Sequence, residues 1–110
     1  MTGFSYSKRE RENIYKDIVS WNGTKKQLIV AVEKMSELCV EICKYINEDF
    51  NPDILSDIAE KTAAVVIMIE QIQLILKLEA EIIKYMNFKL DRMLVNMDDT
   101  SYLYLKDGDD

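Results

Sequence analysis

The 110-residue sequence contains no histidine. This absence excludes Ser-His-Asp and Cys-His catalysis, and it removes the commonest transition-metal ligand. Any bound metal would therefore be a hard cation held by oxygen atoms, such as magnesium or manganese. The sequence also has one proline and three glycines, so few positions favour turns. Long helices are expected rather than many short strands.

Cysteine and long apolar runs are also scarce. The two cysteines, Cys39 and Cys43, lie four residues apart on a predicted helix, and a zinc site would need two more soft ligands. We interpret them as small buried hydrophobic residues in a reducing compartment. The longest apolar run, Ala63–Ile69, is far shorter than a bilayer span, and Met1–Arg11 lacks the apolar core of a signal peptide. We expect a cytoplasmic protein with no membrane partner.

The formal net charge of −6 argues against nucleic acid or an anionic membrane as the main partner. Hydrophobic residues make up 48% of the chain and charged residues 31%, which is typical of a globular domain. We expect a single helical domain over residues 1–97, followed by an acidic tail over residues 98–110.

Helix-start signals divide the first half of the sequence. Ser7–Glu10 has the pattern of a capping box, which predicts a first helix over about residues 8–20. Thr24–Gln27 has the same pattern and predicts a second helix over about residues 24–46.

The second half of the sequence predicts two further helices. Asn51–Asp53 places a capping residue, a proline and an acid where a helix begins. The following helix is apolar on all sides around residues 63–69, so we expect other helices or a second subunit to surround it. A break near Lys77–Glu79 is expected before a further apolar pattern over residues 82–94, because two helices suit a compact bundle better than one very long helix. The fold class is all-α.

Acidic residues recur on two of these helices, in Glu33–Glu37 and in Glu60–Ala64. Carboxylates within an apolar bundle are costly unless a cation or a ligand neutralises them, and helical bundles build metal sites in this way. The order and spacing of the two segments resemble the E-E-x-x-E and E-E-x-x-D motifs of the MazG-like all-α NTP pyrophosphohydrolases. The flanking residues also resemble the family, and the similarity covers about residues 14–94; these flanking residues are Trp21, Gln27, Ile67–Gln71 and Phe88–Arg92.

The resemblance implies a four-to-five-helix bundle whose core is completed by homo-oligomerisation, as a homodimer or a homotetramer. Members of the family cut an NTP into an NMP and pyrophosphate. They use magnesium ions held by the motif carboxylates.

This sequence departs from the family at the metal ligands. The resemblance places the principal ligands at positions 34, 37, 61 and 64, which here are Lys34, Glu37, Lys61 and Ala64. Two positive charges against one negative charge leave these positions at +1, a sign that does not attract a divalent cation. We therefore expect no metal, no cofactor and no catalytic residues; magnesium is expected only if the site is still active. Glu33 and Glu60 remain as remnants of the motifs, about 100° around their helices from positions 34 and 61.

The two lysines have two interpretations. They neutralise the remaining acids as structural ion pairs, or they bind phosphate where the metal ions stood. We favour phosphate binding, because random decay would more often give an uncharged residue. Other candidates for the nucleotide site have competing structural explanations, namely a core position, a solvated helix face or a capping box; they are Trp21, Gln27, Lys44, Lys89 and Arg92.

The sequence thus favours a catalytically degenerate MazG-like protein that binds a nucleotide or nucleotide-derived signal, as a phage-type sequestering or regulatory protein. One alternative is a protein-interaction module, in which Tyr102–Leu105 contacts a partner protein. The other is a working magnesium-dependent pyrophosphohydrolase with displaced ligands; these would be Glu33, Glu41, Asp57 and Glu60.

Overall fold

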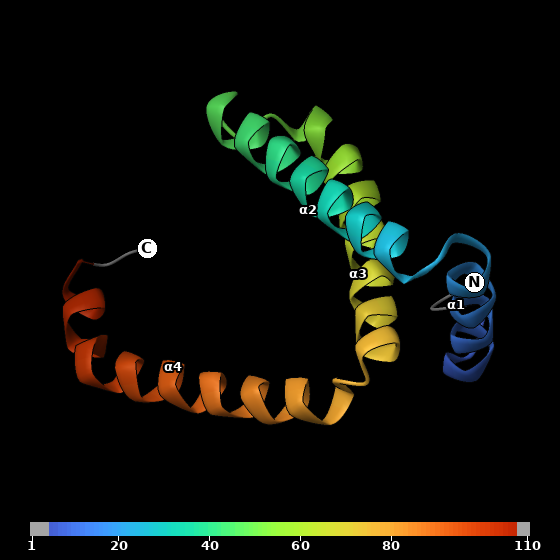
Figure 1. The fold of residues 1–110 in the computed structure, drawn as a ribbon. Helices are drawn as coiled ribbons and strands as arrows, with labels where there is room; N and C mark the ends of the chain where they lie inside the picture. The colour runs from blue at the N-terminus through green and yellow to red at the C-terminus, as the bar shows by residue number, and fades with distance from the viewer. Residues whose placement is uncertain (1–4, 108–110) are drawn as a thin grey trace. The chain divides into compact units, whose positions relative to one another are not determined.

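The computed structural model describes the backbone of residues 5–107 and the side chains of residues 5–97. Its elements are α1 (Lys8–Asn22), α2 (Thr24–Asn47), the short 3-10 helix η1 (Pro52–Ile54), α3 (Leu55–Leu76) and α4 (Glu79–Asp107) (Figure 1). The described backbone is helical without strands, which confirms the all-α expectation. The chain divides after Lys77 into two compact units, one with α1 to α3 and one with α4.

Helix α1 begins as the sequence predicts. The Glu10 amide donates to Ser7 Oγ at 3.1 Å, and the Ser7 amide donates to Glu10 Oε1 at 2.8 Å, so both halves of the capping box form. The helix ends at Asn22, and the Gly23 amide donates to the Val19 carbonyl at 2.7 Å. Gly23 has a φ of 89°, a backbone conformation that glycine adopts without strain.

The second predicted capping box, Thr24–Gln27, is wrong. Gly23 alone joins the two helices, so Thr24 is already helical and the cap position falls on a residue with no side chain. No side-chain hydrogen bond caps α2. The Gln27 side chain is instead buried between α2 and α3.

The loop after α2 closes against that helix and then begins the next one. The Phe50 amide donates to the Tyr45 carbonyl at 2.8 Å, and the two rings meet edge to face at 5.4 Å between centroids. Asn51 Oδ1 then accepts a hydrogen bond of 3.0 Å from the Asp53 amide. The predicted start at Asn51 is therefore confirmed, with η1 leading directly into α3.

The predicted break between the third and fourth helices is also confirmed. Helix α3 ends at Leu76, and Lys77 adopts the left-handed conformation with a φ of 56°. Helix α4 then extends to Asp107, through the segment that we expected to be an acidic tail. The side chains of that segment, including those of Tyr102–Leu105, lie outside the described residues. No described helix is long and apolar enough to span a membrane.

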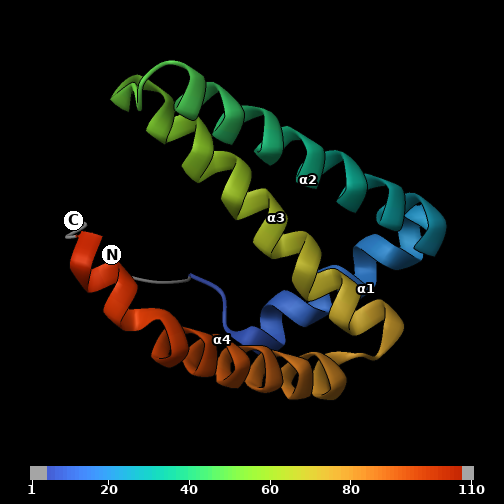
Figure 2. The same ribbon diagram turned by 90° about the vertical axis from the view of Figure 1, so that its left-hand side faces the viewer.

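In the first unit, α2 and α3 lie side by side, and α1 packs against both (Figure 2). The buried apolar residues are Tyr15, Ala31, Ile54, Val65 and Met68. This is a small core, and none of the described side chains is less than 2% exposed.

Much of the apolar α3 sequence is uncovered in the protomer, since Val66, Ile67 and Ile69 are 40–45% exposed. The prediction that the two cysteines are buried is wrong for the protomer. Cys39 and Cys43 are both exposed, because they lie on a side of α2 that turns away from α3.

Candidate functional site

Three residues of the predicted site meet between α2 and α3. Lys34 and Glu37 lie about one turn apart on α2, and Lys61 lies on α3. Lys34 Nζ is 3.7 Å from Glu37 Oε1, and Lys61 Nζ is 3.6 Å from the same oxygen. The packing of α2 against α3 thus brings together three of the four positions that the sequence analysis singled out.

We call Lys34, Glu37 and Lys61 the lysine cluster. It carries a charge of +1 at neutral pH, because two ammonium groups share one carboxylate. The side chains of Lys34, Glu37 and Lys61 are 38%, 43% and 31% exposed, so the cluster is open to solvent. Each ammonium has three donors, and separations of 3.6–3.7 Å are longer than a good hydrogen bond. Both lysines therefore keep donors that an anion can use.

The remnant motif residues do not turn this cluster into a cation site. Glu33 and Glu60 are exposed, and Ala64 is half-buried without a ligating atom. Ammonium groups donate hydrogen bonds and do not ligate metals, so Lys34 and Lys61 do not fit a divalent cation. Within the part of the chain described with side chains, no group of three or more His, Cys, Asp or Glu residues is placed to hold a metal ion.

Lys44 lies apart from the lysine cluster. It is ten residues beyond Lys34 on α2, about 15 Å along the helix axis. Its Nζ is 3.6 Å from Oε1 of Glu41, an oxygen that is buried without a hydrogen-bond partner among the described residues. Lys44 thus offsets the charge of a largely buried carboxylate.

Gln27 belongs to a buried chain of amides. Asn22 Nδ2 donates to Gln27 Oε1 at 2.8 Å, and Gln27 Nε2 donates to Gln71 Oε1 at 2.8 Å. Gln27 and Gln71 are 4% and 2% exposed. The Gln27 side chain therefore connects the start of α2 to α3, and its amide nitrogen is already used.

Trp21 is not a core residue, although a core position was one explanation that the sequence offered for it. It lies in the last turn of α1 and is 89% exposed. The buried residue of α1 is Tyr15 instead. An exposed indole has a free face for a ligand or another protein surface.

Lys89 and Arg92 lie on α4, in the second unit. Both are exposed, and the Arg92 guanidinium lies 5.8 Å from the centroid of the Phe88 ring on the same helix. This contact is a cation–π interaction at a solvated helix face.

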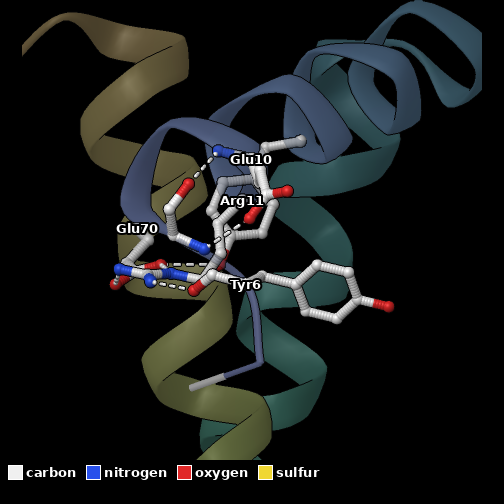
Figure 3. A network of polar contacts seen from close by, with 6 residues as sticks. Tyr6, Glu10, Arg11 and Glu70 are labelled. Atoms are coloured by element: carbon white, nitrogen blue, oxygen red, sulfur yellow. Dashed lines mark hydrogen bonds and ion pairs between the residues drawn. The ribbon is translucent and has the colours of Figure 1, made fainter. Parts of the chain in front are cut away.

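The strongest polar network of the first unit was not predicted from the sequence. Arg11 on α1 contacts Glu70 on α3 through two hydrogen bonds, Nε to Oε1 at 3.0 Å and Nη2 to Oε2 at 3.1 Å (Figure 3). Tyr15 Oη donates to Glu70 Oε1 at 2.6 Å, and Arg11 Nη1 donates to the Tyr6 carbonyl at 3.2 Å. A signal did exist, because Glu70 interrupts the most apolar helix of the chain and so needs a partner.

This network shifts three pKa values. The hydrogen bonds from Arg11 lower the pKa of Glu70, although partial burial opposes the shift. Burial and the hydrogen bond to Glu70 raise the pKa of Tyr15 to about 12. The hydrogen bond to Glu70 also raises the pKa of Arg11. All three groups keep their neutral-pH charges, so the network is a structural clamp between α1 and α3.

A separate groove of about 510 Å³ lies between α1 and α3. Three apolar residues, one serine and two lysines line it; the residues are Lys16, Val19, Ser20, Leu74, Ile75 and Lys77. It shares no residue with the lysine cluster.

No protein-family model, curated protein or solved structure matches this chain. The geometry of the lysine cluster and the composition of the chain therefore carry the functional argument.

Proposed function

We propose that this chain binds a nucleotide or nucleotide-derived anion at the lysine cluster without hydrolysing it. The observation that carries the proposal is that two ammonium groups, Lys34 Nζ and Lys61 Nζ, share a single carboxylate oxygen. The single negative charge of Glu37 balances only one of the two lysines, so one positive charge is left unmatched in a partly exposed position. A phosphate group supplies more charge and more acceptor oxygens than Glu37 does, so it is the better partner for both lysines.

The same residues favour binding over turnover. Hydrolysis of a phosphoanhydride needs an activated water and neutralisation of the developing charge. Lys34 and Lys61 supply the neutralisation. Glu37, the carboxylate of the cluster, is already shared by both ammonium groups, and the chain has no histidine to act as a base.

The proposal includes the architecture that the resemblance implies. The chain would be a catalytically degenerate MazG-like protein whose helical bundle is completed by homo-oligomerisation. The small core of the first unit supports this architecture, as does the exposure of large apolar side chains on α2, α3 and α4. A protein of this kind sequesters or senses a nucleotide rather than consuming it.

Isothermal titration calorimetry tests the proposal. The full-length protein is titrated with a panel of NTPs, NMPs and cyclic nucleotides in EDTA, and heat of binding is expected from at least one of them. Lys34→Ala and Lys61→Ala should each weaken that binding about tenfold or more, because each removes a charge-assisted contact to phosphate.

Lys25→Ala is the matched control. Lys25 is an exposed lysine in the first turn of the same helix α2, so its loss changes the net charge equally without touching the cluster. Absence of heat from every nucleotide would contradict the proposal, and so would equal weakening by Lys25→Ala. Pyrophosphate release that requires added magnesium would instead establish a working hydrolase.

A further inference from the structure

The link between α1 and α2 contains an Asn-Gly sequence, in which the asparagine side chain is chemically reactive. Asn22 is the last residue of α1, and Gly23 alone joins it to α2. Gly23 is exposed, and among the described residues no atom outside its immediate neighbours would lie within 4 Å of a Cβ at this position. The Gly23 nitrogen can therefore approach the Asn22 side chain without a steric barrier. Every other asparagine precedes proline or a residue larger than glycine; these are Asn13, Asn47, Asn51, Asn87 and Asn96.

The reaction at such a junction is the loss of ammonia from the asparagine. The Gly23 nitrogen gives up its proton to solvent and attacks Cγ of Asn22. A bond forms between the two atoms, the bond from Cγ to Nδ2 breaks, and Nδ2 leaves as ammonia after taking a proton from solvent. Water then opens the cyclic imide at either carbonyl, which gives an aspartate or an isoaspartate. The balance is water consumed and ammonia released, so neither an oxidant nor a cofactor is needed.

Two hydrogen bonds oppose this reaction in the folded protein. Asn22 Nδ2 donates to Gln27 Oε1 at 2.8 Å, and the Gly23 amide donates to the Val19 carbonyl at 2.7 Å. The first bond holds the group that must leave, and the second holds the proton that the attacking nitrogen must lose. Gln27 is buried and also donates to Gln71, so it cannot follow a rotation of the Asn22 side chain. The reaction therefore requires local opening of the junction.

The products disrupt the contacts that Asn22 makes. A carboxylate has no donor, so residue 22 then presents an acceptor to the buried Gln27 Oε1. Gln27 can donate to that carboxylate only by reversing its amide, which turns an oxygen toward Gln71 Oε1. The isoaspartate also lengthens the backbone by a carbon atom at the junction where Gly23 alone links the two helices. Both changes weaken the docking of α1.

We propose that Asn22–Gly23 is a deamidation site that the hydrogen bond from Asn22 to Gln27 protects, and that its reaction loosens α1 from α2 and α3. The reaction is intramolecular and requires only water. The site shares no residue with the lysine cluster, so it does not depend on nucleotide binding.

Mass spectrometry of the full-length protein, incubated at neutral pH, tests the site. Deamidation should occur first at Asn22, and it should be at least about tenfold slower in the folded protein than in urea, because opening must precede reaction. Gln27→Leu should accelerate it about threefold or more while circular dichroism shows a helical protein, because the bond to Asn22 is lost.

Gln71→Leu is the matched control. It makes the same substitution in the same buried amide chain but leaves the bond between Asn22 and Gln27, so the rate should stay within about twofold of wild type. The consequence for α1 has its own readout. The isoaspartyl protein, separated by chromatography, should exchange the amide hydrogens of α1 faster than the unmodified protein does.

Three results would overturn the proposal. An Asn22 that stays intact in urea would show that the junction is not reactive. Equal acceleration by Gln27→Leu and Gln71→Leu would show that lost stability, and not the hydrogen bond, sets the rate. Unchanged hydrogen exchange in the isoaspartyl protein would show that α1 is not loosened. Calorimetry of nucleotide binding is independent of all three.

Discussion

Arg11 and Glu70, which are 59 positions apart in the sequence, form a two-pronged ion pair that joins α1 to α3. Their side chains are 17% and 28% exposed, and Tyr15 adds a third hydrogen bond to the same carboxylate. Paired guanidinium and carboxylate groups in such geometry are among the stronger polar contacts in proteins. Because α1 has few other contacts with α3, this clamp should hold α1 in place.

Glu70→Gln should lower the free energy of unfolding by about 1–2 kcal/mol, because it removes the negative charge that accepts hydrogen bonds from Arg11 and Tyr15. Urea denaturation measures the change. Glu60→Gln is the control: Glu60 is exposed on the same helix, and its substitution should cost less than about 0.5 kcal/mol.

The same clamp predicts how stability depends on acidity. The pKa of Glu70 is lowered from its usual 4.5 in the folded state, so its contribution is present above that pH and is lost as the pH falls through the folded value. Glu70→Gln should therefore flatten the acid limb of a plot of unfolding free energy against pH. An unchanged acid limb would show that the ion pair contributes nothing to stability.

The raised pKa of Tyr15 predicts how the free energy of unfolding changes at alkaline pH. Its pKa rises from 10.0 to about 12 on folding, mainly through burial and then through the hydrogen bond to Glu70. Between these values the unfolded chain releases the phenolic proton and the folded chain keeps it, so stability should fall as the pH rises from 10 to about 12. Tyr15→Phe should remove this fall, and absorbance of the phenolate during titration provides an independent check.

The buried amide pair predicts non-additive effects of substitution. Gln27→Leu alone leaves the Gln71 amide buried without its partner, which should cost about 1–3 kcal/mol. The double variant Gln27→Leu, Gln71→Leu should recover most of this loss, because both buried polar groups are then gone. A double-mutant cycle by chemical denaturation measures the coupling; additive losses would contradict this account of the pair.

Lys77 predicts a stabilising substitution. It ends α3 with a φ of 56°, a conformation in which a Cβ atom costs roughly 1 kcal/mol. Lys77→Gly should raise the free energy of unfolding by about 0.5–1 kcal/mol, as measured by thermal and urea denaturation. Lys77→Ala keeps the Cβ and should give little gain. Equal effects of the two variants would show that the backbone conformation is not the cause.

The sequence predicted those parts of the fold that depend on local signals. Ser7 and Glu10 are three residues apart, so their capping box could be found without knowing the rest of the structure. The prediction of a second capping box was wrong because the start of α2 depends on where α1 ends. Gly23 is the only residue between the two helices, so it occupies the cap position that the sequence pattern assigned to Thr24. The core position considered for Trp21 was wrong for a similar reason, since only the packing of α1 against the other helices decides which of its sides is buried.

The candidate site shows the same division. The spacing of Lys34 and Glu37 places them on one side of a helix, which the sequence alone indicates. Their contact with Lys61 depends on the register of α2 against α3. The sequence predicted this contact only through the family resemblance, because no local pattern sets that register. The Arg11–Glu70 clamp depends on the docking of α1, which no local pattern encodes.

Anion binding at the lysine cluster is tested by the affinity of Glu37→Gln for inorganic triphosphate, compared with that of the wild-type protein. In EDTA at neutral pH, loss of the carboxylate that occupies both ammonium groups should tighten binding by about two- to fivefold, with less than about 1 kcal/mol lost in stability. Glu33→Gln, an exposed neutral substitution on the same helix, should bind as wild type does. If Glu37→Gln loses stability and neither protein binds triphosphate, Lys34 and Lys61 are structural ion-pair partners and the proposed binding function is wrong.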